Sequence, residues 1–455
     1  MKVRVVPRPL LSGELRVPGD KSIAHRWLLL AATASGPSRL EGVPISLDVR
    51  STASCLAAVS PRARPGLDLW ASEARPALEG GRSTWNGTVG SAPEAVLEVE
   101  GDGRAALVSP ASDLDCGNSG TSMRLLTGVL ASAPFRSVLT GDPSLSVRPM
   151  ERVAAPLRAM GADIRTTEGH APITVEGGPL HGIRFEAPVA SAQVKSAVLF
   201  AGLAAEGTTT VIEPAPTRDH TERALAALGA AVTVGDGISV GRFQHEGFAG
   251  RVPGDPSSAA FLIGAAALTG SSITLRDVGL NPTRLRFLDV MGRMGIRVTR
   301  SVDREELGEP VGSLHVAAVD GLAPVRVEAA ELPLVVDEVP ILALLAAHAS
   351  GESRFAGAGE LRVKESDRLA AITAGIRALG GRARDEGDDL VVAGGGLGGG
   401  AADAGGDHRM AMSFAVGALA AESPCEIEGI EVADVSFPGF IQALASLGAV
   451  LEDVP

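Results

Sequence analysis

One five-letter stretch, Arg-Val-Pro-Gly-Asp, occurs twice in this chain, at residues 16–20 and again at 251–255. Each copy stands directly ahead of an apolar run. The letters predict the end of a strand, a Pro-Gly turn and an aspartate that caps the next helix. Two matching turns so far apart indicate that the chain crosses twice between two halves. We therefore expect a double hinge at Arg16–Asp20 and Arg251–Asp255.

Six segments share a pattern that supports this division. Each opens with small or polar residues, continues as an alanine-rich helix and breaks at Gly or Ser-Pro into a strand-like stretch. The segments are residues 20–42, 117–141, 191–214, 255–279, 337–360 and 407–430. A second helix follows each of the later five and ends at a glycine, which adopts the left-handed conformation without a steric clash. These glycines are Gly161, Gly229, Gly295, Gly380 and Gly448.

The repeats predict an α/β fold of six units, three in each domain. We expect one domain at 20–250 and a second that combines 1–19 with 251–455, and the length of 455 residues suits two domains. Two stretches do not fit the repeat. We interpret 60–94, rich in Pro, Gly, Ser and Arg, as an inserted surface loop. The glycine-rich stretch 394–406 fits no phosphate-loop spacing, so we interpret it as a flexible connector.

Charge and hydropathy exclude several classes of function. The formal net charge is −13, which argues against nucleic-acid binding because that requires a basic surface. No apolar run reaches the roughly 18 residues of a membrane helix, and the N-terminus lacks a signal-peptide core. The three cysteines have no metal-ligand spacing and suit a reducing cytosol. We therefore expect a cytoplasmic protein with no metal site and no membrane partner.

All six alanine-rich helices begin with polar residues. Free N–H groups at a helix N-terminus attract anions, so several such ends facing one cleft would trap anions despite the net charge. Singly, each of these polar residues is as readily a solvated charge or a helix cap, and it is the joint pattern that carries the prediction. The candidates are Lys21, Ser22, Arg26, Asn118, Gly120, Thr121, Arg124, Arg148, Ser191, Gln193, Lys195, Lys364, Arg368 and Arg409.

Two acidic residues stand out beside these clusters. Asp337 lies at the edge of a strongly apolar stretch, where partial burial would raise its pKa and suit it to proton transfer. A plain helix cap is the alternative interpretation of Asp337. Glu365 is flanked by Lys364 and Arg368, and its alternative is a salt-bridged surface acid.

A set of motifs in the chain resembles the signature of the 5-enolpyruvylshikimate-3-phosphate (EPSP) synthase family. In the family's order they are VPGDKSIAHR, GNSGTSMRLL, GDPSLSVRPM, SAQVKSA, TRDHTE, VKESDR and GDHRMAM, and they cover nearly the whole chain outside 60–94. The resemblance implies a two-lobed, inside-out α/β barrel-like fold of six βαβαββ repeats. It also implies an activity. The enolpyruvyl group of phosphoenolpyruvate passes to the 5-hydroxyl of shikimate 3-phosphate through a tetrahedral ketal, phosphate is released, and no cofactor is needed.

The resemblance implies a role for each matching residue. Asp337 and Glu365 would transfer protons, while Lys21 and Lys364 would contact substrate and developing charge. Shikimate 3-phosphate would bind to Lys21, Ser22, Arg26, Ser191, Gln193, Arg218, Asp337 and Lys364. Phosphoenolpyruvate would bind to Lys21, Asn118, Gly120, Thr121, Arg124, Arg148, Gln193, Lys364, Arg368 and Arg409.

The sequence departs from the family pattern at specific positions. Many members carry a lysine near the C-terminus where this chain has Val435, so that contact is absent or supplied elsewhere. Leu125 and Arg218 resemble a glyphosate-tolerant bacterial group, whereas Gly120 replaces the alanine that marks this group. We hypothesise that glyphosate fits beside Gly120 and competes with phosphoenolpyruvate.

Two other functions remain open from the sequence. A UDP-N-acetylglucosamine enolpyruvyl transferase would share the fold and chemistry, but it usually has a reactive loop cysteine and a Lys-Asn pair, whereas Ser22 follows Lys21 here. A non-catalytic protein that binds anions or RNA ends would need neither Asp337 nor Glu365. We expect a monomer that is open without ligand and closes around shikimate 3-phosphate.

Overall fold

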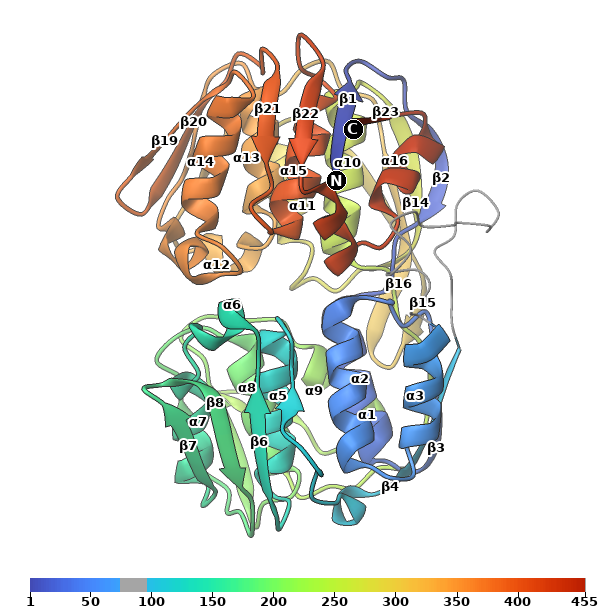
Figure 1. The fold of residues 1–455 in the computed structure, drawn as a ribbon, viewed down its shortest axis with the longest axis vertical. Coiled ribbons are helices and arrows are strands. Elements are labelled where there is room, and N and C mark those ends of the chain that lie inside the picture. Colours follow the sequence, from blue (N-terminus) through green and yellow to red (C-terminus); the bar gives the residue numbers. More distant parts are fainter. Residues whose placement is uncertain (74–95, 455) are drawn as a thin grey trace.

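The computed structural model describes residues 1–73 and 96–454. Its buried apolar side chains form two separate core clusters. One cluster is built from residues 23–252, and the other combines residues 3–17 with residues 259–449. We call the two bodies around these cores the lower lobe and the upper lobe, after their places in Figure 1.

The lower lobe holds three small sheets of related topology within the described residues. In each, an edge strand runs parallel to the strand that follows a central helix, and this second strand pairs antiparallel with the next. In sheet order they are β13 (Ala249–Arg251), β3 (Ser35–Glu41), β4 (Leu97–Asp102); β5 (Leu114–Asp115), β6 (Arg136–Thr140), β8 (His170–Glu176), β7 (Asp163–Thr167); β9 (Arg184–Glu186), β10 (Thr208–Ile212), β12 (Ile238–Gly241), β11 (Thr233–Val234).

The upper lobe repeats this arrangement in three four-stranded sheets of the described chain. Two strands near the N-terminus join sheets that are otherwise built from the second half of the sequence. In sheet order they are β2 (Ser12–Arg16), β14 (Ser272–Gly279), β16 (Glu309–Val316), β15 (Val298–Glu306); β17 (Arg326–Val327), β18 (Glu352–Phe355), β20 (Asp389–Ala393), β19 (Arg382–Glu386); β21 (Gly400–Asp403), β22 (Cys425–Glu428), β1 (Lys2–Val6), β23 (Val450–Val454).

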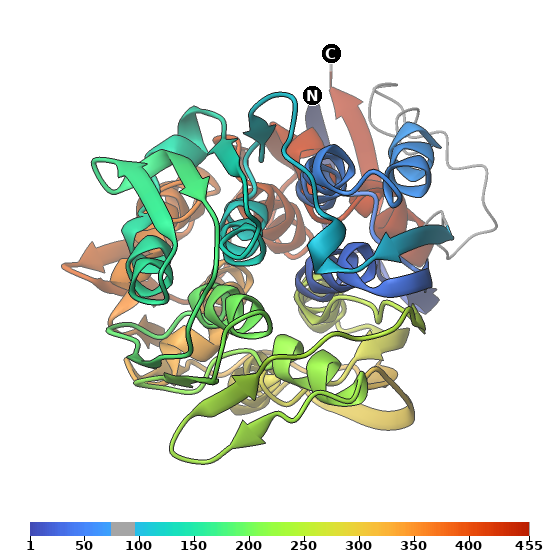
Figure 2. The same cartoon turned by 90° about the horizontal axis from the view of Figure 1, so that it is seen from below.

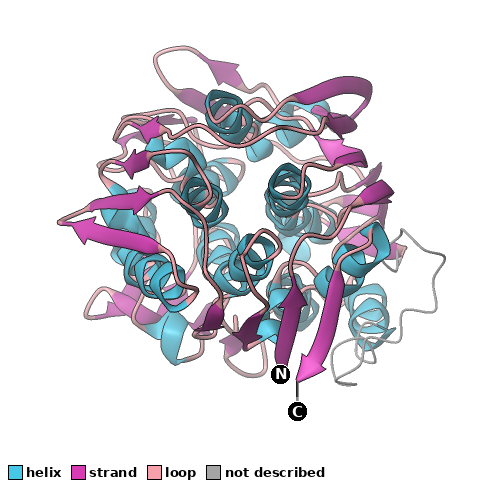
Figure 3. Cartoon of the chain, turned by 90° about the horizontal axis from the view of Figure 1, so that it is seen from above, coloured by secondary structure: helices cyan, strands magenta, loops and turns pink. Residues whose placement is uncertain are grey.

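The alanine-rich segments form the central helices of the two lobes. They are buried on nearly all sides, as helices that are apolar all round must be, and the sheets lie outside them (Figures 2 and 3). In each lobe the central helices thus lie inside and the sheets outside. This arrangement confirms the predicted inside-out fold. No helix in the described part of the chain is long and apolar enough to cross a membrane. The central helices are α1 (Lys21–Thr33), α5 (Gly120–Leu130), α8 (Ala192–Gly202), α10 (Pro256–Leu268), α13 (Val339–Ala347) and α15 (His408–Ala418).

In each unit a second helix follows the strand that comes after the central helix. All five predicted terminal glycines have positive φ, between 80° and 112°, as the left-handed C-cap requires. The second helices are α2 (Leu47–Val59), α7 (Glu151–Ala159), α9 (His220–Ala227), α11 (Arg286–Arg293), α14 (Arg368–Ala378) and α16 (Phe440–Leu447). Shorter turns are α6 (Pro143–Ser146), α12 (Leu332–Val335), η1 (Arg104–Ala106), η2 (Ala358–Val363) and η3 (Ile430–Val435).

The interpretation of 60–94 as a surface loop is wrong for its first part. Helix α3 (Arg64–Glu73) buries Leu67 and Trp70, three positions apart, in the lower core. A Cβ at Gly66 would lie 1.8 Å from the backbone oxygen of Glu98, so glycine lets this helix approach β4 closely. Residues 74–94 of the predicted loop lie outside the described residues.

The glycine-rich stretch is not a flexible connector throughout. Residues 400–403 form the edge strand β21, which pairs in parallel with β22. At Gly399 and Gly400, φ is 118° and 141°, and an added Cβ would lie 2.1 Å from Ser423 Oγ and 2.2 Å from the backbone oxygen of Ala378. Glycine is therefore required here by backbone conformation and close packing.

The two copies of the repeated five letters are the two crossings between lobes. After β2 of the upper lobe the chain enters α1 of the lower lobe, and after β13 of the lower lobe it enters α10 of the upper lobe. Asp20 caps α1 by accepting a hydrogen bond from Ile23 N, and Asp255 caps α10 by accepting one from Ser257 N. The predicted capping is confirmed at both aspartates.

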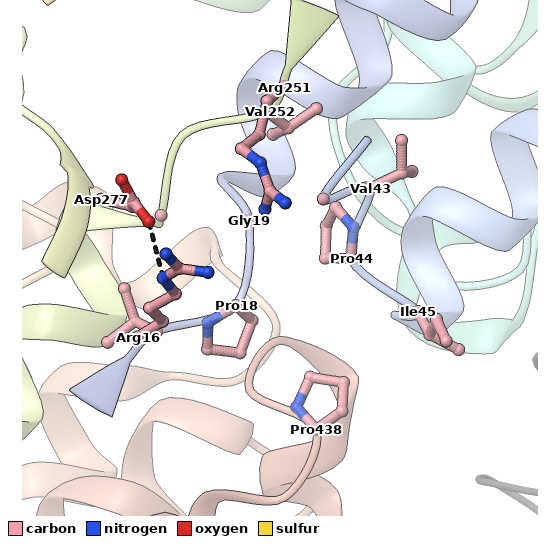
Figure 4. Close-up of a pocket in the computed structure, with 13 residues that line it drawn as sticks. Arg16, Pro18, Gly19, Val43, Pro44, Ile45, Arg251, Val252, Asp277 and Pro438 are labelled. Carbon is pink, nitrogen blue, oxygen red and sulfur yellow. Dashed lines mark ion pairs between the residues drawn. The ribbon is translucent and has the colours of Figure 1, made fainter. Parts of the chain in front are cut away.

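The two crossing segments lie side by side. The backbone nitrogen of Asp20 donates to Pro253 O at 2.6 Å, and that of Asp255 donates to Pro18 O at 2.8 Å. Figure 4 shows the outer face of this junction, where Arg16 pairs with Asp277 at 2.6 Å. Reciprocal backbone hydrogen bonds thus join the two crossing segments.

Candidate active site

A cavity of about 250 Å³ lies between the lobes, and the N-terminal ends of all six central helices form its wall. Five of those ends are capped by a side chain, from an aspartate or a serine. Because helix N-termini carry partial positive charge, the cavity suits anions. The predicted residues that line it are Lys21, Ser22, Asn118, Gly120, Thr121, Arg124, Arg148, Ser191, Gln193, Arg218, Asp337, Lys364, Glu365 and Arg409.

Three candidates, Arg26, Lys195 and Arg368, are not part of the cavity lining. Lys195 is 2% exposed and pairs with Glu213 and Glu222 in the lower lobe. Arg26 is buried in the lower lobe, where it donates to Thr221 Oγ1 and Ser196 Oγ, each at 2.8 Å. Arg368 is 1% exposed and pairs with Asp407 and Glu365. In this structure both guanidinium groups hold neighbouring elements together behind the cavity wall.

Asp337 is surrounded by cations from both lobes. Arg218 donates to Asp337 Oδ2, and Lys364 Nζ and Arg409 Nη2 lie 4.0 and 3.9 Å from its carboxylate. Burial by itself would raise the pKa of Asp337, but these charges, Arg218 foremost, hold it well below its usual range. The expected rise in the pKa of Asp337 is therefore wrong, because the sequence does not reveal how many cations converge on this residue.

The buried acid with a raised pKa is the next residue, Glu338. Burial raises the pKa of the Glu338 carboxyl, and the negative charge of Asp337 adds to this effect. Glu338 is 2% exposed and accepts a hydrogen bond from Ser257 Oγ. It does not line the cavity. Asp337 does not cap a helix, since the residue before α13 is Glu338.

Glu365 faces cations on two sides. Its carboxylate pairs with Arg368 Nη2 at 2.7 Å, and Arg148 Nη1 from the lower lobe lies 3.9 Å away. Burial opposes ionisation of Glu365, but Arg368, His408 and Arg148 together hold its pKa well below the usual range. Asp337 and Glu365 are thus both carboxylates at neutral pH, and either can accept a proton.

The two lysines of the cavity differ in their surroundings. Lys21 Nζ forms a 2.7 Å ion pair with Asp48, on α2. Lys364 has no carboxylate nearer than Asp337, and burial lowers the pKa of its ammonium although Asp337 and Glu365 oppose this. A lowered lysine pKa makes proton donation easier at neutral pH.

A hydrogen-bonded cluster occupies the lower-lobe wall. Arg148 Nη2 donates to Asn118 Oδ1 at 2.6 Å, and Arg124 Nη1 donates to Gln193 Oε1 at 2.5 Å. Gln193 Nε2 in turn donates to Thr121 Oγ1 at 2.8 Å. These contacts orient the two guanidinium groups, whose planar donors match phosphate and carboxylate oxygens.

The model of one protein family matches most of the chain. It is the EPSP synthase (3-phosphoshikimate 1-carboxyvinyltransferase) model, and it matches residues 6–62 and 88–444. The chain belongs to the EPSP synthase family. The unmatched stretch 63–87 spans α3 and agrees with an insertion at this place in the chain.

Relatives of this EPSP synthase family member extend over nearly its full length. A 3-phosphoshikimate 1-carboxyvinyltransferase from Halorhodospira halophila is 46% identical over 458 residues and covers 99% of this chain and 96% of its own. One from Acidithiobacillus ferrooxidans is 44% identical over 454 residues, 98% of each chain. A solved EPSP synthase from Acinetobacter baumannii superposes with a TM-score of 0.82 at 37% identity, over 99% of this chain and 100% of that one.

Sequence reasoning missed several polar residues of this EPSP synthase's cavity, among them Asp48, Arg152, Arg284, Glu360 and His408. Arg152 lies in the first turn of α7, four positions after Arg148, a proximity that could have revealed it. It pairs with Glu360 of the upper lobe at 3.6 Å. His408 stands directly before Arg409 in a motif already singled out. Asp48 has no such sequence signal, because its role depends on the distant Lys21.

The family's missing C-terminal lysine leaves no cation in that position. Val435 ends η3 and does not line the cavity. Arg152 is a cation of the cavity that lies outside the family motifs quoted above. The prediction that the missing contact is absent or supplied elsewhere keeps both of its alternatives.

Proposed function

We propose that this cavity transfers the enolpyruvyl group of phosphoenolpyruvate to the 5-hydroxyl of shikimate 3-phosphate and releases phosphate, as in the shikimate pathway toward chorismate. One observation carries the proposal. Lysines and arginines from both lobes surround two ionised carboxylates in a single cavity. Two phosphorylated carboxylic acids need such cations, and their condensation needs proton transfer.

Shikimate 3-phosphate is assigned to the wall formed by α1, α8 and the segment before α9. Ser22, Ser191, Gln193 and Arg218 line this wall with hydroxyl, amide and guanidinium groups. Arg218 pairs with Asp337 in this structure, so a bound phosphate or carboxylate would compete for that guanidinium. Asp337 and Lys364 complete this subsite from the upper lobe, close to the 5-hydroxyl that must lose its proton.

Phosphoenolpyruvate is assigned to the cations of α5, the loop before α7, α15 and Lys364. Arg124 and Arg148 present planar donors from below, and Lys364 and Arg409 contribute charge from above. Gly120 stands where an added Cβ would lie 2.9 Å from Arg124 Nη1, so glycine leaves room for an anion beside that guanidinium. Lys21 lies between the two subsites.

The chemistry then requires three proton transfers. The 5-hydroxyl oxygen attacks C2 of phosphoenolpyruvate while its proton passes to a carboxylate and C3 gains a proton, which gives a tetrahedral ketal. The ketal loses phosphate as a proton leaves C3. Asp337 and Glu365 are the proton acceptors of this sequence, and Lys364, with its lowered pKa, is suited to donate. Lys21 offsets negative charge as it develops.

The sequence alternatives are weaker for physical reasons. A UDP-N-acetylglucosamine enolpyruvyl transferase with a reactive cysteine does not fit, because Cys116 is fully buried and its pKa is raised. A non-catalytic anion binder gives no reason for two half-buried carboxylates among the cations, since both weaken anion binding. We further propose that the enzyme acts as a monomer, since residues of one chain form the whole cavity. We also propose that it is cytoplasmic.

A phosphate-release assay with both substrates tests the assignment. The purified chain should release phosphate with shikimate 3-phosphate present, and not with UDP-N-acetylglucosamine in its place. Asp337→Asn should keep shikimate 3-phosphate binding within about tenfold while kcat falls by about 10²–10⁴-fold, as for loss of a proton-transfer group. Asp320→Asn, at an exposed position of the same lobe, is the matched control. Full activity of Asp337→Asn, or no release by the parent protein, contradicts the proposal.

A further inference from the structure

Arg284 joins the two capping aspartates of the crossings. It lies between β14 and α11 in the upper lobe, and its side chain is 2% exposed. One guanidinium nitrogen, Nη1, donates to Asp20 Oδ2. The other, Nη2, donates to Asp255 Oδ1 at 2.7 Å. The two aspartates occupy the same position in the two copies of the repeated five letters, and a single arginine binds both.

These aspartates begin central helices of different lobes. Asp20 uses Oδ1 to cap α1 of the lower lobe and leaves Oδ2 for Arg284. Asp255 caps α10 of the upper lobe. The guanidinium group therefore fixes the N-terminus of a lower-lobe helix relative to that of an upper-lobe helix. An ion pair within one lobe would stabilise that lobe alone, whereas this one also fixes how the lobes sit together.

The contacts of Arg284 lead toward the reacting groups on both sides. On the lower side, the residue after Asp20 is Lys21, which lines the cavity. On the upper side, Arg284 Nη2 donates to Ser257 Oγ at 2.9 Å, and Ser257 donates to Glu338, the neighbour of Asp337. Lys21 and Asp337 are thus each one residue away from a group held by this network.

The charges around Arg284 make the network strong. Burial opposes ionisation of Asp20, but Arg284, His220 and the hydrogen bond from Ile23 N together outweigh it and lower the pKa of Asp20 to about 2. The pKa of Arg284 is raised, since nearby acids outweigh its burial. His220 Nε2 also lies 3.4 Å from Arg284 Nη1. Without the guanidinium, two buried carboxylates would face each other unpaired, which is strongly unfavourable.

We propose that Arg284 is a positioning residue that holds the two lobes in the closed arrangement in which Lys21 and Asp337 face one substrate pair. It acts through Asp20, Asp255 and Ser257 and does not itself react. The inference rests on the proposed function for its catalytic consequence, but the closed arrangement can be measured without turnover.

Two variants test this role. Arg284→Lys keeps one positive charge but cannot serve both aspartates with a planar fork. Asp255→Asn keeps the helix cap, since asparagine caps as well as aspartate, and removes the charge that Arg284 binds. Val290→Ala, a core truncation of α11 in the same lobe, is the control for lost stability, because it touches neither crossing.

Hydrogen–deuterium exchange of the full chain with shikimate 3-phosphate, together with kcat in the phosphate-release assay, supplies the readouts. Both crossing variants should exchange faster in residues 16–22 and 251–257 than elsewhere, and kcat should fall by about tenfold or more, as expected for misplaced reacting groups. Val290→Ala should lower the melting temperature and keep kcat within about twofold.

Three results would overturn the proposal. The first is unchanged exchange at both crossings in both variants. The second is an equal rise in exchange over both lobes, which would make Arg284 a general stabilising residue. The third is a kcat loss in Val290→Ala as large as in the crossing variants. If the parent protein shows no turnover, the proposed function fails, and the exchange at the crossings still decides the role of Arg284.

Discussion

Arg218 of the lower lobe donates a hydrogen bond to Asp337 of the upper lobe across the cavity. The same guanidinium is the largest favourable charge acting on the Asp337 carboxyl, whose pKa it lowers. One contact thus links the closure of the lobes to the protonation state of an acid assigned to catalysis. Substrate anions that bind Arg218 would weaken this link and let the pKa of Asp337 rise toward its usual range.

Arg218→Gln should raise the KM for shikimate 3-phosphate. A charged hydrogen bond contributes roughly 1.5–3 kcal/mol, so we expect an increase of about 10–100-fold. Steady-state kinetics with saturating phosphoenolpyruvate measures it. Arg242→Gln, an exposed arginine of the same lobe that donates to Ala204 O, should leave this KM unchanged. A KM for Arg218→Gln within about twofold of the parent value would show that Arg218 does not hold this substrate.

Lys364→Arg should change the alkaline side of the pH profile. Burial lowers the pKa of Lys364 from its ordinary value of 10.5, and the charged form is the active one. Activity should therefore be lost as pH rises through this lowered pKa. Arginine stays charged up to about pH 12 and does not donate its proton at neutral pH. The variant should therefore have a lower kcat/KM, and that kcat/KM should show no such alkaline loss. Lys2→Arg, on the surface, is the control. The same alkaline decline in Lys364→Arg would assign that limb to another group.

Gly120→Ala should weaken glyphosate more than phosphoenolpyruvate. The added methyl would lie 2.9 Å from Arg124 Nη1 and 3.6 Å from Arg148 Nη1, so it intrudes on the proposed anion subsite. We expect the inhibition constant to rise by about tenfold or more and the KM by less, because one methyl in a tight pocket is worth about 1–3 kcal/mol. Gly178→Ala, where a Cβ meets nothing within 4 Å, is the control. Inhibition of the parent that does not depend on phosphoenolpyruvate concentration would refute the premise.

His25→Gln should flatten the acid dependence of stability. Burial lowers the pKa of His25 to about 3, so the folded state keeps it neutral while the unfolded chain takes up a proton below its ordinary pKa of 6.5. Its contribution to stability is complete above pH 6.5 and is lost as pH falls toward 3. The loss is about 1.4 kcal/mol per pH unit.

Urea unfolding between pH 6.5 and pH 5 measures this slope. In that window the carboxylates with lowered pKa do not yet titrate. His408, whose pKa is also lowered to about 3, and His245 and His348, whose pKa values are lowered by burial, contribute slopes of the same sign. His25→Gln should therefore remove part of the total, up to about 1.4 kcal/mol per pH unit. His315→Gln, at an exposed position of β16, is the control. A slope for His25→Gln equal to that of the parent would mean that His25 is not kept neutral by the fold.

Much of the architecture could be predicted because its signals are local. The caps at Asp20 and Asp255 depend on backbone N–H groups two or three residues away, and the glycines after the second helices answer a local steric need. The repetition of these signals indicated six units and two crossings. Helix α3 was not predicted because its Pro and Gly are typical of a loop, whereas its stability comes from burying Leu67 and Trp70 against β4.

What the sequence by itself determined is the set of chemical groups and the helix ends that carry them. The tertiary structure decided their ionisation and partners. Asp337 is ionised because Arg218, 119 positions away, lies against it, and Lys21 is held by Asp48 of another helix. Arg26, which shares a motif with Ser22, turns away from the cavity into a buried network. Charge interactions depend on distance and burial, and neither is defined until segments remote in sequence have packed together.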